Sequence, residues 1–154
     1  MDASVGMRRI SMWSAVATLC VLLVLAGCSP NFRPAFVASG APLDSAGTQR
    51  LARSTALGKL AAVETGRAPV LRAQALAYLR TLGPAGSRAA DLLTVGFPAR
   101  TPSVPVLVRV CRVDGRAAVV VVEAWGVPGG TLDRHRLWIF DRVTGGIIGA
   151  AAFR

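Results

Sequence analysis

The sequence has few of the side chains on which most catalytic and metal sites depend: one histidine, three cysteines and eight acidic residues. It also contains a single lysine, Lys59, so its formal net charge of +10 comes almost entirely from arginine. The arginines are mostly spread singly, with no dense basic run and no interleaved aromatic platform. Because nucleic-acid binding needs a concentrated positive field, no nucleic-acid partner is expected. A solvated basic surface is the favoured interpretation, and weak attraction to anionic lipid headgroups is the alternative.

The N-terminus has the three parts of a secretory signal. Arg8 and Arg9 form a positive region, residues 15–24 are apolar, and Ala26-Gly27 supply the small residues of a cleavage site. The apolar part is short for a membrane span, which needs about 20 apolar residues. Residues 10–32 carry no charge, however, so an uncleaved anchor stays open as an alternative.

The segment Leu25-Ala26-Gly27-Cys28 resembles the lipobox of bacterial lipoproteins. In that family the cysteine thiol receives a diacylglycerol, and a dedicated peptidase then cuts before the cysteine. The resemblance covers residues 1–28 and implies cleavage between Gly27 and Cys28, with Cys28 as the acylated first residue. Two or three acyl chains meet the requirement for stable anchoring, at about 0.8 kcal/mol per buried CH₂.

The resemblance implies a domain outside the cytoplasm, anchored by lipid to the cell membrane or an outer membrane. Ser29, rather than an aspartate, follows the cysteine. In a cell with an outer membrane, this residue type resembles that of lipoproteins sent onward to it. The predicted organisation is a signal peptide (1–27), the lipidated Cys28 with a proline-rich flexible tether (28–44), and one domain (45–154). Residues 28–154 keep sixteen basic and seven acidic side chains, a net charge of +9, and are numerous enough for one ordinary core.

The first half of the domain has helical signals. Residues 45–64 have a fair apolar face that ends before Gly66. The signal is stronger in 69–82, where one helical stripe contains Leu71, Ala75, Tyr78, Leu79 and Leu82. Ser87 is a candidate N-cap for a short third helix ending at Val95. The GPAGSR segment, residues 83–88, lacks the lysine and the full glycine spacing of a phosphate loop and is interpreted as an interhelical turn.

The second half predicts strands. Asp114-Gly115 is a strong hairpin turn signal between two β-branched runs, and the segment AAVVVVEAW is apolar except at Glu123, which favours a central strand. The expected fold is α+β, with N-terminal helices covering one face of a four-stranded antiparallel β-meander. The predicted strands are residues 104–113, 116–125, 134–141 and 146–153.

No catalytic residue, metal site or cofactor is predicted. If Cys28 is lipidated and Cys20 leaves with the signal, Cys111 is a lone thiol, and closed zinc sites take four ligands. Cys111 is interpreted as apolar filling and His135 as a solvated side chain, although Asp133 lies near it in sequence. Asp114, Asp133 and Asp141 sit at predicted turns, where aspartate accepts backbone hydrogen bonds.

Two functional hypotheses remain. The first is a non-enzymatic accessory that binds another protein of the cell envelope. The second is a small hydrophobic-ligand binder with an apolar cavity between helices and sheet. Glu123 and Arg109 are its candidate ligand-binding residues, although Glu123 is more readily expected to face solvent or an arginine across the sheet. A deep cavity with either residue at its mouth favours the ligand binder, whereas a closed core with an exposed apolar patch favours the accessory.

Overall fold

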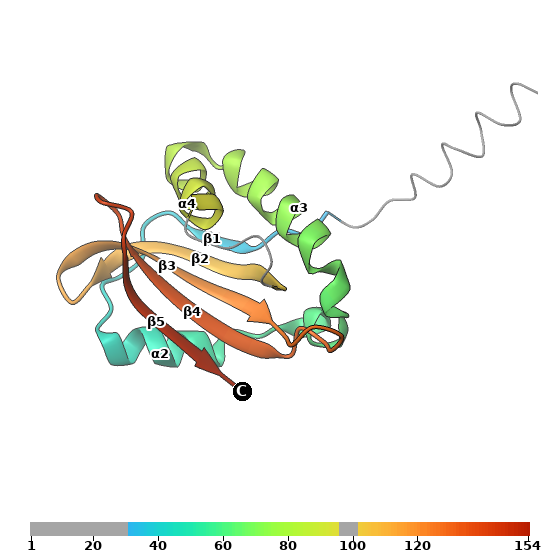
Figure 1. Ribbon diagram of the computed structural model, residues 1–154. Coiled ribbons are helices and arrows are strands. Elements are labelled where there is room, and N and C mark those ends of the chain that lie inside the picture. The colour runs from blue at the N-terminus through green and yellow to red at the C-terminus, as the bar shows by residue number, and fades with distance from the viewer. Residues whose placement is uncertain (1–30, 96–101) are drawn as a thin grey trace, which may run out of the picture. The chain divides into compact units, whose positions relative to one another are not determined.

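The computed structural model describes residues 31–95 and 102–154 (Figure 1). The predicted signal peptide, the lipobox and the cleavage point between Gly27 and Cys28 lie outside the described residues. None of the helices in the described ranges has the length and apolar character needed to cross a bilayer.

A mixed five-stranded sheet in the order β1-β2-β3-β4-β5 forms the centre of the fold. The strands β2 to β5 form the predicted antiparallel meander, which is confirmed, and AAVVVVEAW lies in the central strand β3 as expected. The fifth strand, β1, pairs with β2 in parallel and was not predicted. The strand bounds are Ala35–Val37 (β1), Ser103–Val113 (β2), Arg116–Trp125 (β3), Arg134–Asp141 (β4) and Ile147–Phe153 (β5).

The segment expected to be part of a tether instead runs along β2. Beyond β1, the N–H of Gly40 donates to the carbonyl of Val110, and that of Leu43 donates to the carbonyl of Arg112, each at 2.8 Å. The segment supplies partners for polar backbone groups on the side of β2 that faces away from β3, and such groups are costly to bury unpaired. The described domain therefore begins at Asn31 rather than after residue 44.

The turn between β2 and β3 has the predicted chemistry. Asp114 and Gly115 both have positive φ, 48° and 81°, as a type I′ turn requires at its two central residues. Val113 and Arg116 pair directly across it. The Asp-Gly pair therefore fixes the register in which β3 meets β2.

The helices differ from prediction mainly at their ends. Helix α2 covers Ser45–Ser54 rather than 45–64, and two 3₁₀ turns follow at Gly58–Ala62 and Thr65–Arg67. The carboxylate of Asp44 caps α2 by accepting from the N–H of Gly47. Gly58, at φ 55°, takes a left-handed conformation that a continuing helix does not allow.

The next two helices follow closely on each other. Helix α3, Ala68–Arg80, confirms the strongest helical prediction. Helix α4 is Gly83–Val95, so the GPAGSR segment is its beginning and Ser87 lies inside the helix instead of capping it. Pro84 suits this position because the first turn of a helix does not need its missing N–H.

Helices cover both faces of the sheet, not one face as predicted (Figure 1). Val120 and Val122 belong to a core that includes Ala52 of α2. Val119 and Val121 belong to a second core with Leu79 of α3 and residues of α4. Because successive side chains of a strand point to opposite faces, the apolar run of β3 is buried on both sides.

Helices α3 and α4 approach closely at Gly86, where a methyl group has no room. A Cβ at this position would lie 2.2 Å from the carbonyl oxygen of Leu79. We expect Gly86→Ala to lower the free energy of unfolding by about 1–3 kcal/mol through overpacking, although alanine is favoured over glycine in exposed helices by about 1 kcal/mol. Urea unfolding would measure the change.

The matched control is Gly66→Ala, because nothing lies within 4 Å of the added methyl group there. The control should leave the unfolding midpoint within a few tenths of a kcal/mol of the wild type. A Gly86→Ala protein as stable as the wild type would contradict the close helix contact.

Candidate functional site

Glu123 is fully buried at the end of β3, and both of its carboxylate oxygens have donors. Nη1 of Arg72, on α3, donates to Oε1 at 2.6 Å. Nε1 of Trp138, on β4, donates to Oε2 at 3.0 Å. The arginine that forms the ion pair with Glu123 therefore comes from a helix packed on the sheet, although Arg136 lies directly across from Glu123 on β4. Glu123 does not face solvent.

Arg72 binds more than the carboxylate. Its Nη2 donates to the carbonyl oxygen of Leu93 at 2.9 Å, near the end of α4. Its Nη1 lies 3.3 Å from the hydroxyl of Ser103, at the start of β2. A buried ion pair is tolerated when additional hydrogen bonds satisfy the remaining donors and acceptors. Arg72 thus joins two helices to two strands, which indicates a structural role.

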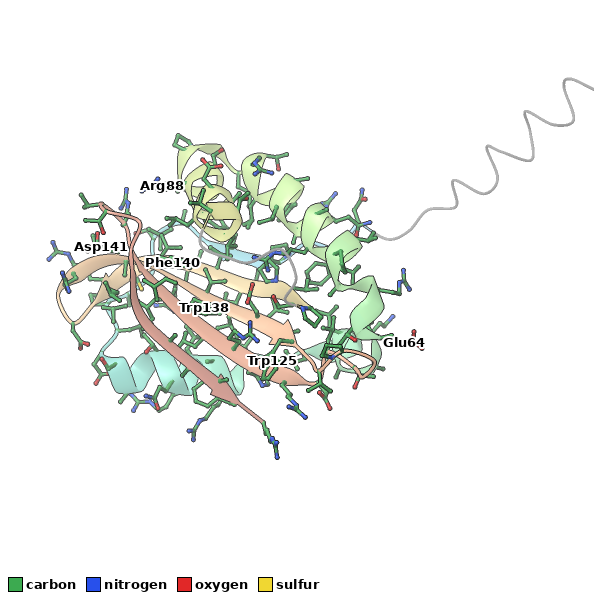
Figure 2. The ribbon with its side chains drawn as sticks, viewed as in Figure 1. Glu64, Arg88, Trp125, Trp138, Phe140 and Asp141 are labelled. Carbon is green, nitrogen blue, oxygen red and sulfur yellow. The ribbon has the colours of Figure 1, made fainter. Side chains whose placement is uncertain are left out.

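Beside this pair lie the rings of Trp125 and Trp138 (Figure 2), and two arginines of β4 are close to them. The guanidinium of Arg136 lies 4.5 Å from the ring centroid of Trp125 and 5.8 Å from that of Trp138. Arg134 lies 5.4 Å from the same Trp125 ring. Burial lowers the pKa of Arg136, the charge of Glu123 opposes this, and the charge of Arg72 adds to it. These side chains contribute cation–π contacts and positive charge.

Arg109, the second residue assigned to ligand binding, supports the chain that runs beside β2. Its Nη2 donates to the carbonyl oxygen of Ala41 at 3.0 Å. Its side chain also packs against Gly40, where an added Cβ would lie 2.3 Å from Nε. Neither Arg109 nor Glu123 is among the residues that line the two clefts described below.

His135 and Cys111 are not brought together. His135 pairs with Ala124 near one end of β3, whereas Cys111 pairs with Ala118 near the other. Nε2 of His135 lies 2.7 Å from the carbonyl oxygen of Thr55, so in the tautomer protonated at Nε2 it links β4 to the end of α2. Burial raises the pKa of the Cys111 thiol, against the opposing charge of Arg109, which disfavours the nucleophilic thiolate.

The aspartates act mainly in turns and ion pairs. Asp114 accepts from the backbone N–H and the hydroxyl of Ser45. The N–H groups of Thr144 and Val143 donate to Asp141 at 2.9 Å each and lower its pKa. The turn interpretation is confirmed for both residues. Asp133 lies 3.8 Å from Arg134, and within residues 31–95 and 102–154 no three His, Cys, Asp or Glu residues could hold a metal ion together.

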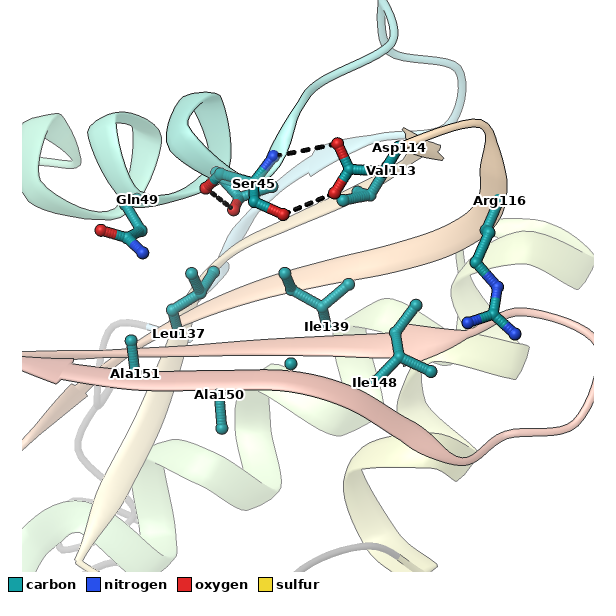
Figure 3. A pocket seen from close by; sticks show the side chains of 12 residues that line it. Ser45, Gln49, Val113, Asp114, Arg116, Leu137, Ile139, Ile148, Ala150 and Ala151 are labelled. Carbon is teal, nitrogen blue, oxygen red and sulfur yellow. Dashed lines mark hydrogen bonds between the residues drawn. The ribbon is translucent and has the colours of Figure 1, made fainter.

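A cleft of about 340 Å³ lies between α2 and the strands β4 and β5 (Figure 3). Apolar side chains from both strands line it: Leu137, Ile139, Ile148 and Ala151. Polar side chains border it: Ser45, Gln49, Asp114 and Arg116. A second cleft, of about 430 Å³, lies beside α3 and is lined by Phe32, Arg33, Gln74 and Tyr78, among others. The ligand-binding alternative expected an apolar cavity between helices and sheet, but sequence patterns did not indicate the residues that line either cleft, because each cleft joins segments that are distant in the chain.

The side chains that sequence reasoning missed are Arg72 and Trp138. One signal was available for Arg72: it lies three and seven residues before Ala75 and Leu79, on the buried face of the same helix.

Comparison with protein-family models, with curated proteins and with solved structures finds no match to this chain.

Proposed function

We propose that this chain is a lipid-anchored, non-enzymatic accessory module that binds another protein of the cell envelope. The anchor is Cys28, on the basis of the lipobox Leu25-Ala26-Gly27-Cys28. The module holds its partner close to the membrane from outside the cytoplasm. The side chains best suited to chemistry have structural contacts: Glu123 and His135 form hydrogen bonds within the domain, and the thiol of Cys111 is buried in the core.

The observation that carries the proposal is a closed core combined with an exposed apolar surface on the β4–β5 hairpin. Val143, Ile147 and Ile148 are exposed there, with Ile147 at 47%. Exposed apolar residues that gather in one region are typical of interaction sites, whereas scattered single residues are not. The alternative, a small hydrophobic-ligand binder, has less support because Glu123 is sealed by Arg72 and Trp138.

The test is purification of the tagged, full-length chain from membranes in mild detergent, followed by mass spectrometry of the co-purifying proteins. We expect one envelope protein in stoichiometric amount. Ile147→Glu should lose it, because a carboxylate resists burial in an apolar contact. Val70→Glu is the matched control, since Val70 is also exposed but lies on α3. A wild-type chain that purifies alone would contradict the proposal.

A further inference from the structure

The outer edge of β5 is unprotected. The strand pairs with β4, and it is the last strand in the sheet order, so no described strand pairs with its other side. Edge strands are usually short, charged, interrupted by proline or covered, because an open edge pairs with other chains. The sequence of β5, IIGAAAF, contains no charge and no proline over seven residues. The opposite edge, β1, has three residues.

Helix α2 runs along β5 and forms the other wall of the cleft (Figure 3). At one end Ser45 binds Asp114, beside the turn that leads into β3. At the other end the guanidinium of Arg53 lies 4.8 Å from the ring of Phe153. A strand added to β5 would point every second side chain to the α2 side of the sheet. The cleft offers space there, with Ile148 and Ala151 as apolar contacts.

The surroundings of this edge are basic. Arg116 lines the cleft with a side chain 66% exposed, and its contact to Asp141 is long, at 4.0 Å. Arg53 lies at the far end, and Arg154 directly follows β5. A second copy of this chain would bring these arginines together, in addition to the +9 charge of residues 28–154. An acidic partner is attracted, because complementary charge steers association and like charge opposes it.

We propose that β5, together with the cleft between α2 and the strands β4 and β5, binds an extended, acidic segment of the partner protein by strand addition. This inference rests on the proposed function, because it assigns the surface through which the accessory meets its partner. Main-chain hydrogen bonds along β5 supply affinity, and the cleft selects apolar side chains at alternate positions, as in other strand-addition sites. The flanking arginines select for glutamate and aspartate at the ends of the segment.

The experiment titrates the full-length protein in detergent with a defined peptide, capped at both ends, in which Val-Thr repeats are flanked by glutamates. The readouts are calorimetry and hydrogen exchange of residues 147–153. We expect binding with slower exchange of the β5 amides, and affinity about tenfold weaker for a peptide with lysines in place of the glutamates. Equal binding of both peptides, or no binding of either, would overturn the proposal.

Two variants of β5 provide a matched pair. Ile148→Glu places a carboxylate in the cleft and should weaken binding of the acidic peptide about tenfold or more. Ala152→Glu adds the same charge on the same strand, but Ala152 is exposed and is not among the residues that line the cleft, so its binding should stay within about twofold of the wild type. Similar losses in both variants would contradict a role for the cleft.

The outcomes separate this inference from the proposed function. Slow exchange of β5 that depends on protein concentration without peptide would identify a second copy as the occupant and overturn the acidic partner. A wild-type chain that co-purifies an envelope protein but does not bind the acidic peptide would overturn strand addition alone. A wild-type chain that purifies without a partner would contradict the proposed accessory function, and with it this inference.

Discussion

Replacing Arg72 with methionine is expected to lower the free energy of unfolding by about 3–5 kcal/mol, because the variant removes the cation that is hydrogen-bonded to a buried carboxylate. Glu123 has no exposed surface, and the guanidinium of Arg72 is its cationic partner at 2.6 Å. Domains of this size are usually stable by about 5–15 kcal/mol, so the loss would remove a large part of the total. Chemical unfolding followed by tryptophan fluorescence would measure it.

Two further variants make the result specific. Arg80→Met removes an exposed arginine from the same helix, 3.9 Å from Asp91, and should cost less than about 1 kcal/mol. The double variant Arg72→Met/Glu123→Gln buries no charge and keeps an amide oxygen as acceptor for Trp138, so it should recover most of the loss. An Arg72→Met protein no less stable than Arg80→Met would show that the ion pair is unimportant for stability.

Replacing Cys28 with alanine is expected to abolish membrane association or to leave an unprocessed precursor. The lipobox resemblance predicts that the Cys28 thiol is the site of acylation, and acyl chains contribute about 0.8 kcal/mol for each buried CH₂. Alanine has no thiol to modify. Membrane flotation, together with mass spectrometry of the mature N-terminus, would report both processing and anchoring.

The control is Cys20→Ala, which changes a cysteine inside the predicted apolar region of the signal. This variant should be processed and anchored like the wild type, because Cys20 is predicted to leave with the signal. If the Cys28→Ala protein migrates and floats like the wild type, the lipoprotein assignment is wrong. If both variants lose anchoring, the effect comes from export rather than from acylation.

Local signals in the sequence were sufficient for the meander. The Asp114-Gly115 turn, the β-branched runs on either side and the apolar runs of β4 and β5 are properties of neighbouring residues, and they place four strands within one residue of their observed ends. The helix α3 also follows from local periodicity. In each case the tertiary structure agrees with the local preference.

The remaining features depend on contacts between distant segments. The three residues of β1 have no strand pattern of their own and form a strand because β2 offers an unpaired edge. The helices divide between two faces because β3 is apolar on both sides, and sequence periodicity does not say which helix covers which face. Glu123 and Arg72 are each unusual in their own element, and only the packing of α3 on the sheet brings them together.

The parallel pairing of β1 with β2 also bears on the order of folding. Each neighbouring pair among β2, β3, β4 and β5 is joined by a short connection, whereas Ala35 meets Leu107 only after the chain between them has closed a long loop. Loop closure costs entropy before the contacts it allows are gained. The hairpins therefore have a kinetic advantage, and β1 joins late. The segment nearest the predicted lipid anchor is then the last strand to dock and the first to detach when the domain opens locally.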